Sequence, residues 1–280
     1  MFASGSTVAT VVYGQGGSFT SSTANLGGVS ASSLSRPFGV AVDASGGVYT
    51  VDEGNNRALY FPSGVTSAAT RVYGQVAESV SALESAQVAS ALSLSSTLSP
   101  MAAAYALPFS YSSSNSGGVN VYSLNVPRGG VCVDPTGGVY LSDSGNNRVL
   151  RYSGASTMAS TVYGQGGSFS SAVVNSGGTV SASSMYYPSS VARDASGAVY
   201  VVDESNHRML YFASGATTAT RVWGQDGIFT TATCNNGGVG PNTLCYPYAV
   251  VLDSSGKPYI ADYGHTHGHS DAAVLPHTCL

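Results

Sequence analysis

Residues 36–61, RPFGVAVDASGGVYTVDEGNNRALYF, decide how this chain folds. Three short apolar runs, at 39–42, 48–51 and 58–61, are separated by the segments DASGG and DEGNNR. Val- and Tyr-rich runs bounded by Gly, Asp and Asn predict β-strands joined by tight turns. The stretch therefore predicts a meander of three antiparallel strands.

The same stretch returns at 127–152, at 188–212 and, for its first half, at 247–262. A further apolar element follows each full copy, at 71–75, 161–165 and 221–225, and a similar VVYGQ stands at 11–15. Four strands in a repeating unit predict propeller blades rather than one large sheet. We expect one all-β domain over 1–280, a β-propeller of about four four-stranded blades, with repeats near 36–75, 126–165, 187–225 and 246–262.

The repeat carries the motif Pro-x-x-Val-x-x-Asp, followed by Gly-x-Val-Tyr-x-x-Asp-x-x-Asn-x-Arg. This motif resembles the NHL repeat, with three full copies and a fourth that matches only the first half. The resemblance implies a β-propeller with NHL-type blades. It implies no single function, because NHL propellers include RNA-binding and ubiquitin-ligase modules, extracellular sensor domains and an amidating lyase.

The two ends of the repeat series complement each other. Residues 2–11 resemble 212–221, so the chain starts near the end of a third strand, and the last copy leaves the pattern after its second strand. We expect either a composite blade that closes the ring or an incomplete, fragmentary propeller. Two further segments depart from the repeat: an Ala/Ser-rich insert at 77–106, which is a lid, a disordered loop or retained non-coding sequence, and an aberrant tail at 263–280.

Acidic and arginine residues recur at fixed positions of the repeat. The first aspartate begins a turn whose amides can bond its carboxylate. The second precedes an arginine, whose planar fork suits a carboxylate or backbone carbonyls. Because an active site is asymmetric whereas this set repeats, we predict a structural role for Asp43, Asp52, Arg57, Asp134, Asp143, Arg148, Asp194, Asp203, Arg208, Asp253 and Asp262.

Two cysteines stand at paired positions of one loop. Cys234 and Cys245 replace, for example, Val174 and Tyr186 of the preceding copy. A paired replacement favours a disulfide over two free thiols, and closing such a loop contributes about 3 kcal/mol. A disulfide indicates an oxidising compartment, so we expect an extracellular or cell-surface protein, although 1–15 shows no secretory signal.

Three histidines of the tail, His265, His267 and His269, are spaced two residues apart. In an extended strand they would share one face and form a candidate metal site. The resemblance implies zinc in the channel of the amidating lyases, held by histidines of separate blades, and here the other blades offer only His207.

The composition limits the remaining function classes. Only 9% of residues are charged, with ten basic and fourteen acidic groups, and nucleic-acid surfaces need clustered Lys and Arg. No run of 18 apolar residues indicates a transmembrane helix, and no nucleophile elbow or phosphate-binding loop is present. We expect a non-enzymatic interaction module for a protein or small extracellular ligand, without a cofactor. The alternative is a metal-dependent propeller enzyme, a lyase or lactonase with zinc or calcium.

Overall fold

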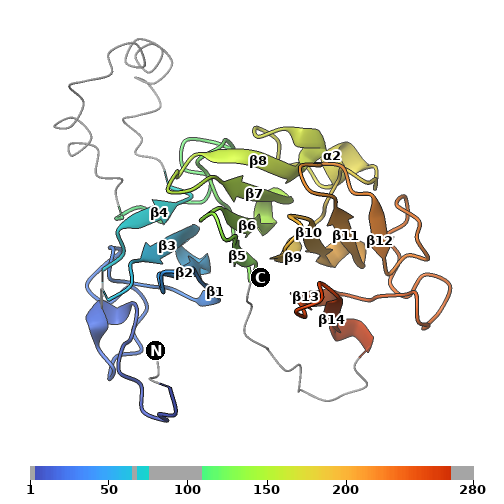
Figure 1. The fold of residues 1–280 in the computed structure, drawn as a ribbon. Helices are drawn as coiled ribbons and strands as arrows, with labels where there is room; N and C mark the ends of the chain where they lie inside the picture. The colour runs from blue at the N-terminus through green and yellow to red at the C-terminus, as the bar shows by residue number, and fades with distance from the viewer. Residues whose placement is uncertain (1–3, 65–67, 76–108, 266–280) are drawn as a thin grey trace.

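The computed structural model describes residues 4–64, 68–75 and 109–265. These residues form antiparallel sheets that fan around a common centre, with β1, β5, β9 and β13 innermost (Figure 1). Three sheets have four strands each, and one has two. The chain is therefore an all-β propeller with NHL-type blades, as the sequence predicts.

Each sheet follows the order of the chain. The first contains β1 (Pro37–Val42), β2 (Val48–Asp52), β3 (Arg57–Phe61) and β4 (Arg71–Tyr73). The second contains β5 (Val131–Val133), β6 (Val139–Asp143), β7 (Arg148–Tyr152) and β8 (Ala159–Gly164). The third contains β9 (Pro188–Arg193), β10 (Val199–Asp203), β11 (Arg208–Phe212) and β12 (Arg221–Trp223). The fourth contains β13 (Pro247–Leu252) and β14 (Pro258–Asp262).

Short 3-10 turns follow the second strand of every sheet: η2 (Glu53–Asn55), η3 (Ser144–Asn146), η5 (Glu204–Asn206) and η6 (Tyr263–His265). The loops between blades hold η1 (Gln15–Gly17), η4 (Gln165–Gly167) and α2 (Asn175–Gly178). The residue after η2, η3 and η5 is left-handed, with φ between 52° and 55°, and is Asn56, Asn147 or His207. Asparagine accepts this conformation readily, which explains the Asn-Arg of the motif.

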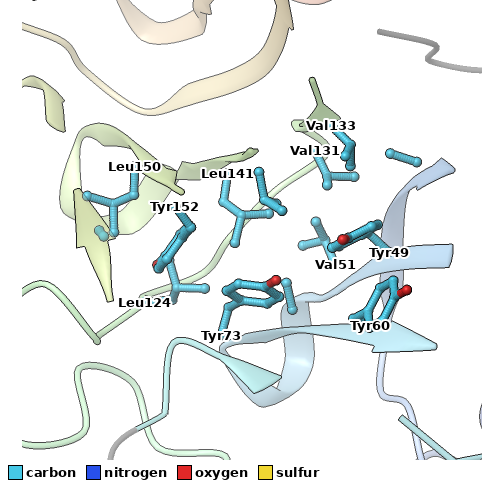
Figure 2. Packing of buried hydrophobic residues seen from close by; sticks show 14 of the residues in the cluster. Tyr49, Val51, Tyr60, Tyr73, Leu124, Val131, Val133, Leu141, Leu150 and Tyr152 are labelled. Atoms are coloured by element: carbon cyan, nitrogen blue, oxygen red, sulfur yellow. The ribbon is translucent and has the colours of Figure 1, made fainter. Parts of the chain in front are cut away.

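The core lies between the sheets. Tyr49, Val51 and Tyr73 of the first sheet pack against buried residues of the second sheet, which include Leu141 and Tyr152 (Figure 2). These side chains come from alternate positions of their strands, because successive residues of a strand face opposite sides of its sheet. Burial of such aromatic and aliphatic groups is the main source of blade-to-blade stability.

One aromatic contact recurs between blades. Tyr73 meets Tyr152, on the third strand of the next blade, edge to face with ring centroids 5.0 Å apart. Tyr163 packs in the same way on Phe212 at 5.1 Å, and Tyr13 lies 4.9 Å from Phe61. The segment around Tyr13 therefore docks on the first sheet as the fourth strand of a preceding blade would.

The expected composite blade is not formed by the described residues. Strand β13 pairs with β14 in a two-stranded sheet, and the segment around Tyr13 packs on the first sheet instead of joining them. The last copy lacks the motif of a third strand, so nothing in the described ranges connects β14 to an N-terminal fourth strand. The predicted insert at 77–106 lies outside the described residues, as does the tail after residue 265. In the described part of the chain, no helix has the length and apolarity needed to cross a membrane.

Candidate functional site

A buried arginine fork holds the loops around each full blade. The guanidinium of Arg208 places Nε 2.8 Å from Asp203 Oδ2, and both side chains are fully buried. Its Nη1 donates to the carbonyl of Phe229 at 2.6 Å, and its Nη2 donates to the carbonyls of Ser181 and Ser184 at 2.9 and 3.0 Å. One side chain therefore ties the loop before the blade to the loop after it.

The same fork occurs in the other full blades. Arg57 contacts Asp52, and Arg148 contacts Asp143, each at 2.7 Å and without solvent exposure. Burial raises the pKa of Asp143, and the charge of Arg148 together with hydrogen bonds from Asn125 and an asparagine of η3 opposes that shift. The predicted contact between the second aspartate and the arginine is thus present, and its complete burial favours the structural role.

The first aspartates close hairpin turns. Asp134 accepts hydrogen bonds from the amide and hydroxyl of Thr136, at 2.9 and 2.6 Å, and from the amide of Gly138 at 2.8 Å. These donors outweigh burial and lower the pKa of Asp134. Asp43 and Asp253 accept the same three hydrogen bonds in their own turns.

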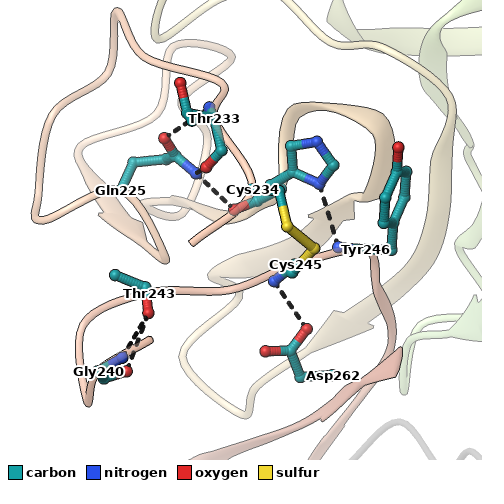
Figure 3. Close-up of a disulfide and its surroundings, with 9 residues drawn as sticks. Gln225, Thr233, Cys234, Gly240, Thr243, Cys245, Tyr246 and Asp262 are labelled. Carbon is teal, nitrogen blue, oxygen red and sulfur yellow. Dashed lines mark hydrogen bonds between the residues drawn. A yellow bond between two sulfur atoms is a disulfide. The ribbon is translucent and has the colours of Figure 1, made fainter. Parts of the chain in front are cut away.

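The predicted disulfide between Cys234 and Cys245 is present (Figure 3). Inside its loop the amide of Asn235 donates to the carbonyl of Leu244 at 3.1 Å. The amide of Cys245 donates to Asp262 Oδ1 at 2.9 Å, which anchors the loop to the end of β14. The disulfide therefore fixes the loop that leads into the innermost strand of the fourth blade.

Hydrogen bonds between a side chain and a backbone amide join successive blades. The Nδ1 atom of His207 accepts the backbone N–H of Tyr246 at 3.1 Å, and the two rings meet edge to face at 4.4 Å. Asn56 and Asn147, at the same repeat position, accept the amide that precedes the next proline at 2.8 and 2.9 Å. Since Nδ1 must be unprotonated to accept, His207 is neutral here, and burial lowers its pKa.

The residues that follow the first proline of each repeat converge at the centre. These are Phe38, Arg128, Ser189 and Tyr248, one from each blade. The guanidinium carbon of Arg128 lies 5.6 Å from the ring centre of Phe38 and 5.4 Å from that of Tyr248. It also lies 5.7 Å from the ring of Tyr187, which precedes the proline of the third repeat. We call Phe38, Arg128, Tyr187, Glu204 and Tyr248 the axial cluster.

An extra residue places Arg128 over the centre. The aspartate follows the proline by six residues in three repeats and by seven in the second. There Gly129 has φ 65°, the amide of Gly130 donates to the carbonyl of Arg128 at 2.7 Å, and β5 starts only at Val131. Strands β1, β9 and β13 instead start at their prolines. An inserted residue at a strand end re-aims a side chain, as β-bulges do.

Close packing of backbones brings the cluster together. A Cβ atom on Gly39 would overlap the carbonyl oxygen of Gly129, and one on Gly129 would lie 2.7 Å from that of Ser189. The hydroxyl of Ser189 donates to the carbonyl of Tyr248 at 2.9 Å. The innermost strands thus approach through residues without bulk, and this leaves the larger side chains of the axial cluster on the face above them.

The charges of the axial cluster are linked. Burial alone would lower the pKa of Arg128. The nearby Tyr248 and Glu204 raise it by more, so the pKa of Arg128 is raised overall. Burial raises the pKa of Glu204 against the attraction of Arg128 and a contact with Ser189. The Oε2 atom of Glu204 is buried and has no hydrogen-bond partner among the described residues. No ion pair within 4.0 Å joins the two charges in the described ranges, and Arg128 instead contacts the hydroxyls of Tyr187 and Tyr248.

The axial cluster is not predicted from the sequence. Its members are different residue types at equivalent positions, so no repeated motif marks them. The available signal was the additional residue between Pro127 and Asp134.

The predicted metal site stays a prediction. The side chain of His265 and all of His267 and His269 lie outside what the structure describes. Within the described ranges, no three or more His, Cys, Asp or Glu residues are grouped so as to hold a metal ion.

Comparisons with known proteins found one family model and several solved structures. The family model described as NHL repeat matches residues 129–152 and 185–212. Similar solved structures include a streptogramin B lyase, with 11% identity, a TM-score of 0.44, and coverage of 86% of this chain and 51% of that chain. They also include virginiamycin B lyase from Staphylococcus aureus, with 10% identity, a TM-score of 0.41, and coverage of 81% and 48%. An auxiliary nutrient binding protein from Bacteroides ovatus has 12% identity, a TM-score of 0.46, and coverage of 82% and 46%.

This chain spans about half the length of these solved structures. No curated protein matches it. Both matched segments contain the two aspartates and the arginine that the first blade carries at the equivalent positions. The NHL repeat model therefore matches segments in two of the four blades of this chain.

Proposed function

We propose that this propeller is a non-enzymatic binding module that meets its ligand or protein partner at the face around the axial cluster. The observation that carries the proposal is Arg128, which is held among rings from three other repeats. Its partners among the described residues include the hydroxyls of Tyr187 and Tyr248, and no carboxylate there lies within 4.0 Å of it, whereas the buried arginines Arg57, Arg148 and Arg208 each bind a carboxylate within the fold. An oriented cation that is partly exposed suits the recognition of an anionic group.

The exposure of the aromatic residues supports the same face. The ring of Phe38 is 46% exposed, and Tyr246 and Tyr263, near the same ends of their strands, are 48% and 68% exposed. Tyr and Arg are enriched at the centres of binding interfaces. The disulfide and the low charge favour an extracellular or cell-surface setting for this module.

The test measures binding to arrays of peptides, extracellular proteins and glycans. We expect saturable binding by the full chain, weakened at least tenfold by Phe38→Ala with Tyr248→Ala. The matched control is Tyr259→Ala, which removes a ring that is 52% exposed on β14. Unchanged circular dichroism melting would show that the variants fold. Affinity that is unchanged in Phe38→Ala with Tyr248→Ala, or the absence of saturable binding by the wild type, would overturn the proposal.

The metal-dependent enzyme remains the alternative proposal. It requires a metal at the histidine tail, so we would measure the zinc and calcium content of the purified chain before and after chelation, and turnover of lactone and lyase substrates. Stoichiometric metal with turnover that chelation abolishes would replace the binding module by the enzyme. For the binding module we expect a melting temperature that chelation leaves unchanged.

A further inference from the structure

We propose that the axial cluster recognises a carboxylate of a protein partner, either an Asp or Glu side chain or the partner's free C-terminus, with Arg128 as its anchor. This inference rests on the proposed binding function and adds the chemistry of the ligand. It is carried by the donors of Arg128, by the polarity of its neighbours and by the shape of the face.

The guanidinium of Arg128 is held in place by rings. Those of Phe38, Tyr187 and Tyr248 lie within 5.7 Å of its central carbon and hold the group by cation–π attraction. The hydroxyls of Tyr187 and Tyr248 also hydrogen-bond with the guanidinium, and because an arginine has five N–H donors, donors remain for a ligand. A planar fork with two parallel N–H groups fits a carboxylate with two hydrogen bonds, and its pre-ordered position reduces the entropy cost of binding.

The charges around the fork select against more heavily charged anions. Glu204 attracts Arg128, and both Glu204 and Glu53 act on the neighbouring Tyr248. A phosphate dianion or a nucleic-acid backbone would meet these acidic groups beside the fork, and nucleic acid needs several cations in a row. A single carboxylate requires one oriented cation and fits this balance.

The carboxylate of Glu204 affects the ligand through its charge. Its Oε2 atom is buried and accepts no hydrogen bond from a described residue. A buried acceptor without a donor is costly. Because this atom is buried, a partner does not reach it, and Glu204 acts on the ligand through its charge beside Arg128.

The shape of the face favours a protein over a small molecule. Two of the cavities in the described ranges, of about 340 and 160 Å³, are lined by residues from 9–50 and from 222–260. Neither cavity includes a member of the axial cluster. Pockets for small molecules enclose most of their ligand, whereas the rings here stand on an exposed face. Aromatic and arginine residues of this kind are typical anchors in protein interfaces.

The test uses four pools of fluorescent nonapeptides and the full chain. Two pools have a central Asp or Glu among randomised neutral positions, with a free C-terminus or a C-terminal amide. The other two have Asn or Gln at the centre, with the same two termini. We expect tenfold or tighter binding of pools that carry a carboxylate, and a ten- to hundredfold loss with Arg128→Gln.

Lys257→Gln is the matched control. Lys257 lies in the turn between β13 and β14, at the opposite end of β13 from Tyr248, and we expect it to leave binding unchanged. The pool with central Asn or Gln and a free C-terminus distinguishes a terminal from a side-chain carboxylate. A second readout needs no folding assumption: the Nε–H signal of Arg128 in the 15N spectrum of the wild type shifts on titration with the acidic pool.

The outcomes separate the inference from the proposed function. Equal binding of all pools, an unmoved Arg128 signal, or preference for phosphopeptides would overturn carboxylate recognition. If carboxylate recognition fails in this way but Phe38→Ala with Tyr248→Ala still abolishes binding to the arrays, the proposed binding function stands and only the proposed ligand chemistry is wrong. If no pool binds, carboxylate recognition fails, and the arrays alone decide the module.

Discussion

Removing the arginine of one blade tests whether the repeated Asp–Arg pairs are structural. In Arg208→Met, the carboxylate of Asp203 loses its Nε donor at 2.8 Å, and three backbone carbonyls lose donors at 2.6–3.0 Å. Both charged side chains are fully buried, so water does not replace the lost bonds. Methionine has a similar length, which keeps the cavity small.

Breaking a fully buried ion pair by removing one partner costs about 3–5 kcal/mol. A decrease of this size in the free energy of unfolding raises the unfolding equilibrium constant roughly a hundred- to a few-thousandfold. Asp203→Asn combined with Arg208→Met removes the stranded charge as well. We therefore expect the double variant to lose less than the sum of the single variants, although the three carbonyls stay unsatisfied.

The assay is urea unfolding followed by tyrosine fluorescence and far-ultraviolet circular dichroism. Arg151→Met is the matched control, because Arg151 lies 3.5 Å from Asp134 with 27% of its side chain exposed. Arg151 keeps contact with water, and Asp134 keeps three donors within its own turn, so we expect a loss of about 1 kcal/mol or less. A loss below about 1 kcal/mol for Arg208→Met, equal to that of the control, would refute the structural interpretation of the pair.

Three further predictions concern other parts of the fold. Replacing Cys234 and Cys245 together by Ser should lower the free energy of unfolding by about 3 kcal/mol, measured by urea unfolding; no change would mean that the disulfide is dispensable. Burial lowers the pKa of His207, so the free energy of unfolding should fall as pH drops below about 6.5, where the imidazole of the unfolded chain takes up a proton first. His207→Asn keeps a hydrogen-bond acceptor for the next blade, so its melting temperature should not change with pH between pH 5 and 7 in this way. If the variant keeps the pH dependence of the wild type, the neutral, buried His207 is not its cause. Gly39→Ala should cost about 2 kcal/mol or more by overpacking the centre, whereas Gly240→Ala, where an added Cβ meets nothing within 4 Å, should melt within a degree or two of the wild type; equal melting of both would argue against the close approach.

The sequence predicts the parts of this molecule that repeat. Strand order follows from the spacing of the Val- and Tyr-rich runs, and the Asp203–Arg208 contact follows from a motif present in three copies. The disulfide follows from a paired substitution against the other copies. Each inference compares a position with its equivalents, and the structure places those equivalents in the same environment.

The axial cluster could not be predicted in that way. Phe38, Arg128 and Tyr248 stand at one repeat position yet differ in type, so a comparison of copies reads them as variable. Their proximity depends on how the sheets are arranged around the centre, and on the backbone approach at Gly39. Binding residues on a repeat fold lie where the copies differ, because the shared positions are used to hold the blades together.

The fourth blade has a disulfide where the other blades have a buried arginine. In the first three blades the arginine binds carbonyls of the preceding loop, but His267 stands at that position of the fourth copy. The loop before the fourth blade instead carries the disulfide, worth about 3 kcal/mol, which is close to the value of a buried fork. We therefore expect the disulfide to stabilise the fourth blade where the other blades use the arginine.

This substitution of the disulfide for the arginine gives a rescue experiment. Ala24 and Ser35 are the counterparts of the two cysteines, with the same separation. The backbone bond from Asn25 to Leu34, at 3.0 Å, matches that of the disulfide-bonded loop, and the Ser35 amide donates to Asp52 Oδ1 at 2.6 Å as the Cys245 amide does to Asp262.

Ala24→Cys with Ser35→Cys should therefore form a disulfide in the first loop, and it should restore about 3 kcal/mol to Arg57→Met. Urea unfolding of the oxidised protein measures the gain, with the same cysteines in the wild-type background as the control. A bridge that forms, as shown by peptide mapping without reduction, but returns no stability to Arg57→Met would mean that the arginine acts mainly by neutralising its aspartate. In that case the fourth blade would hold its acid by other means, and the disulfide and the arginine would not be equivalent.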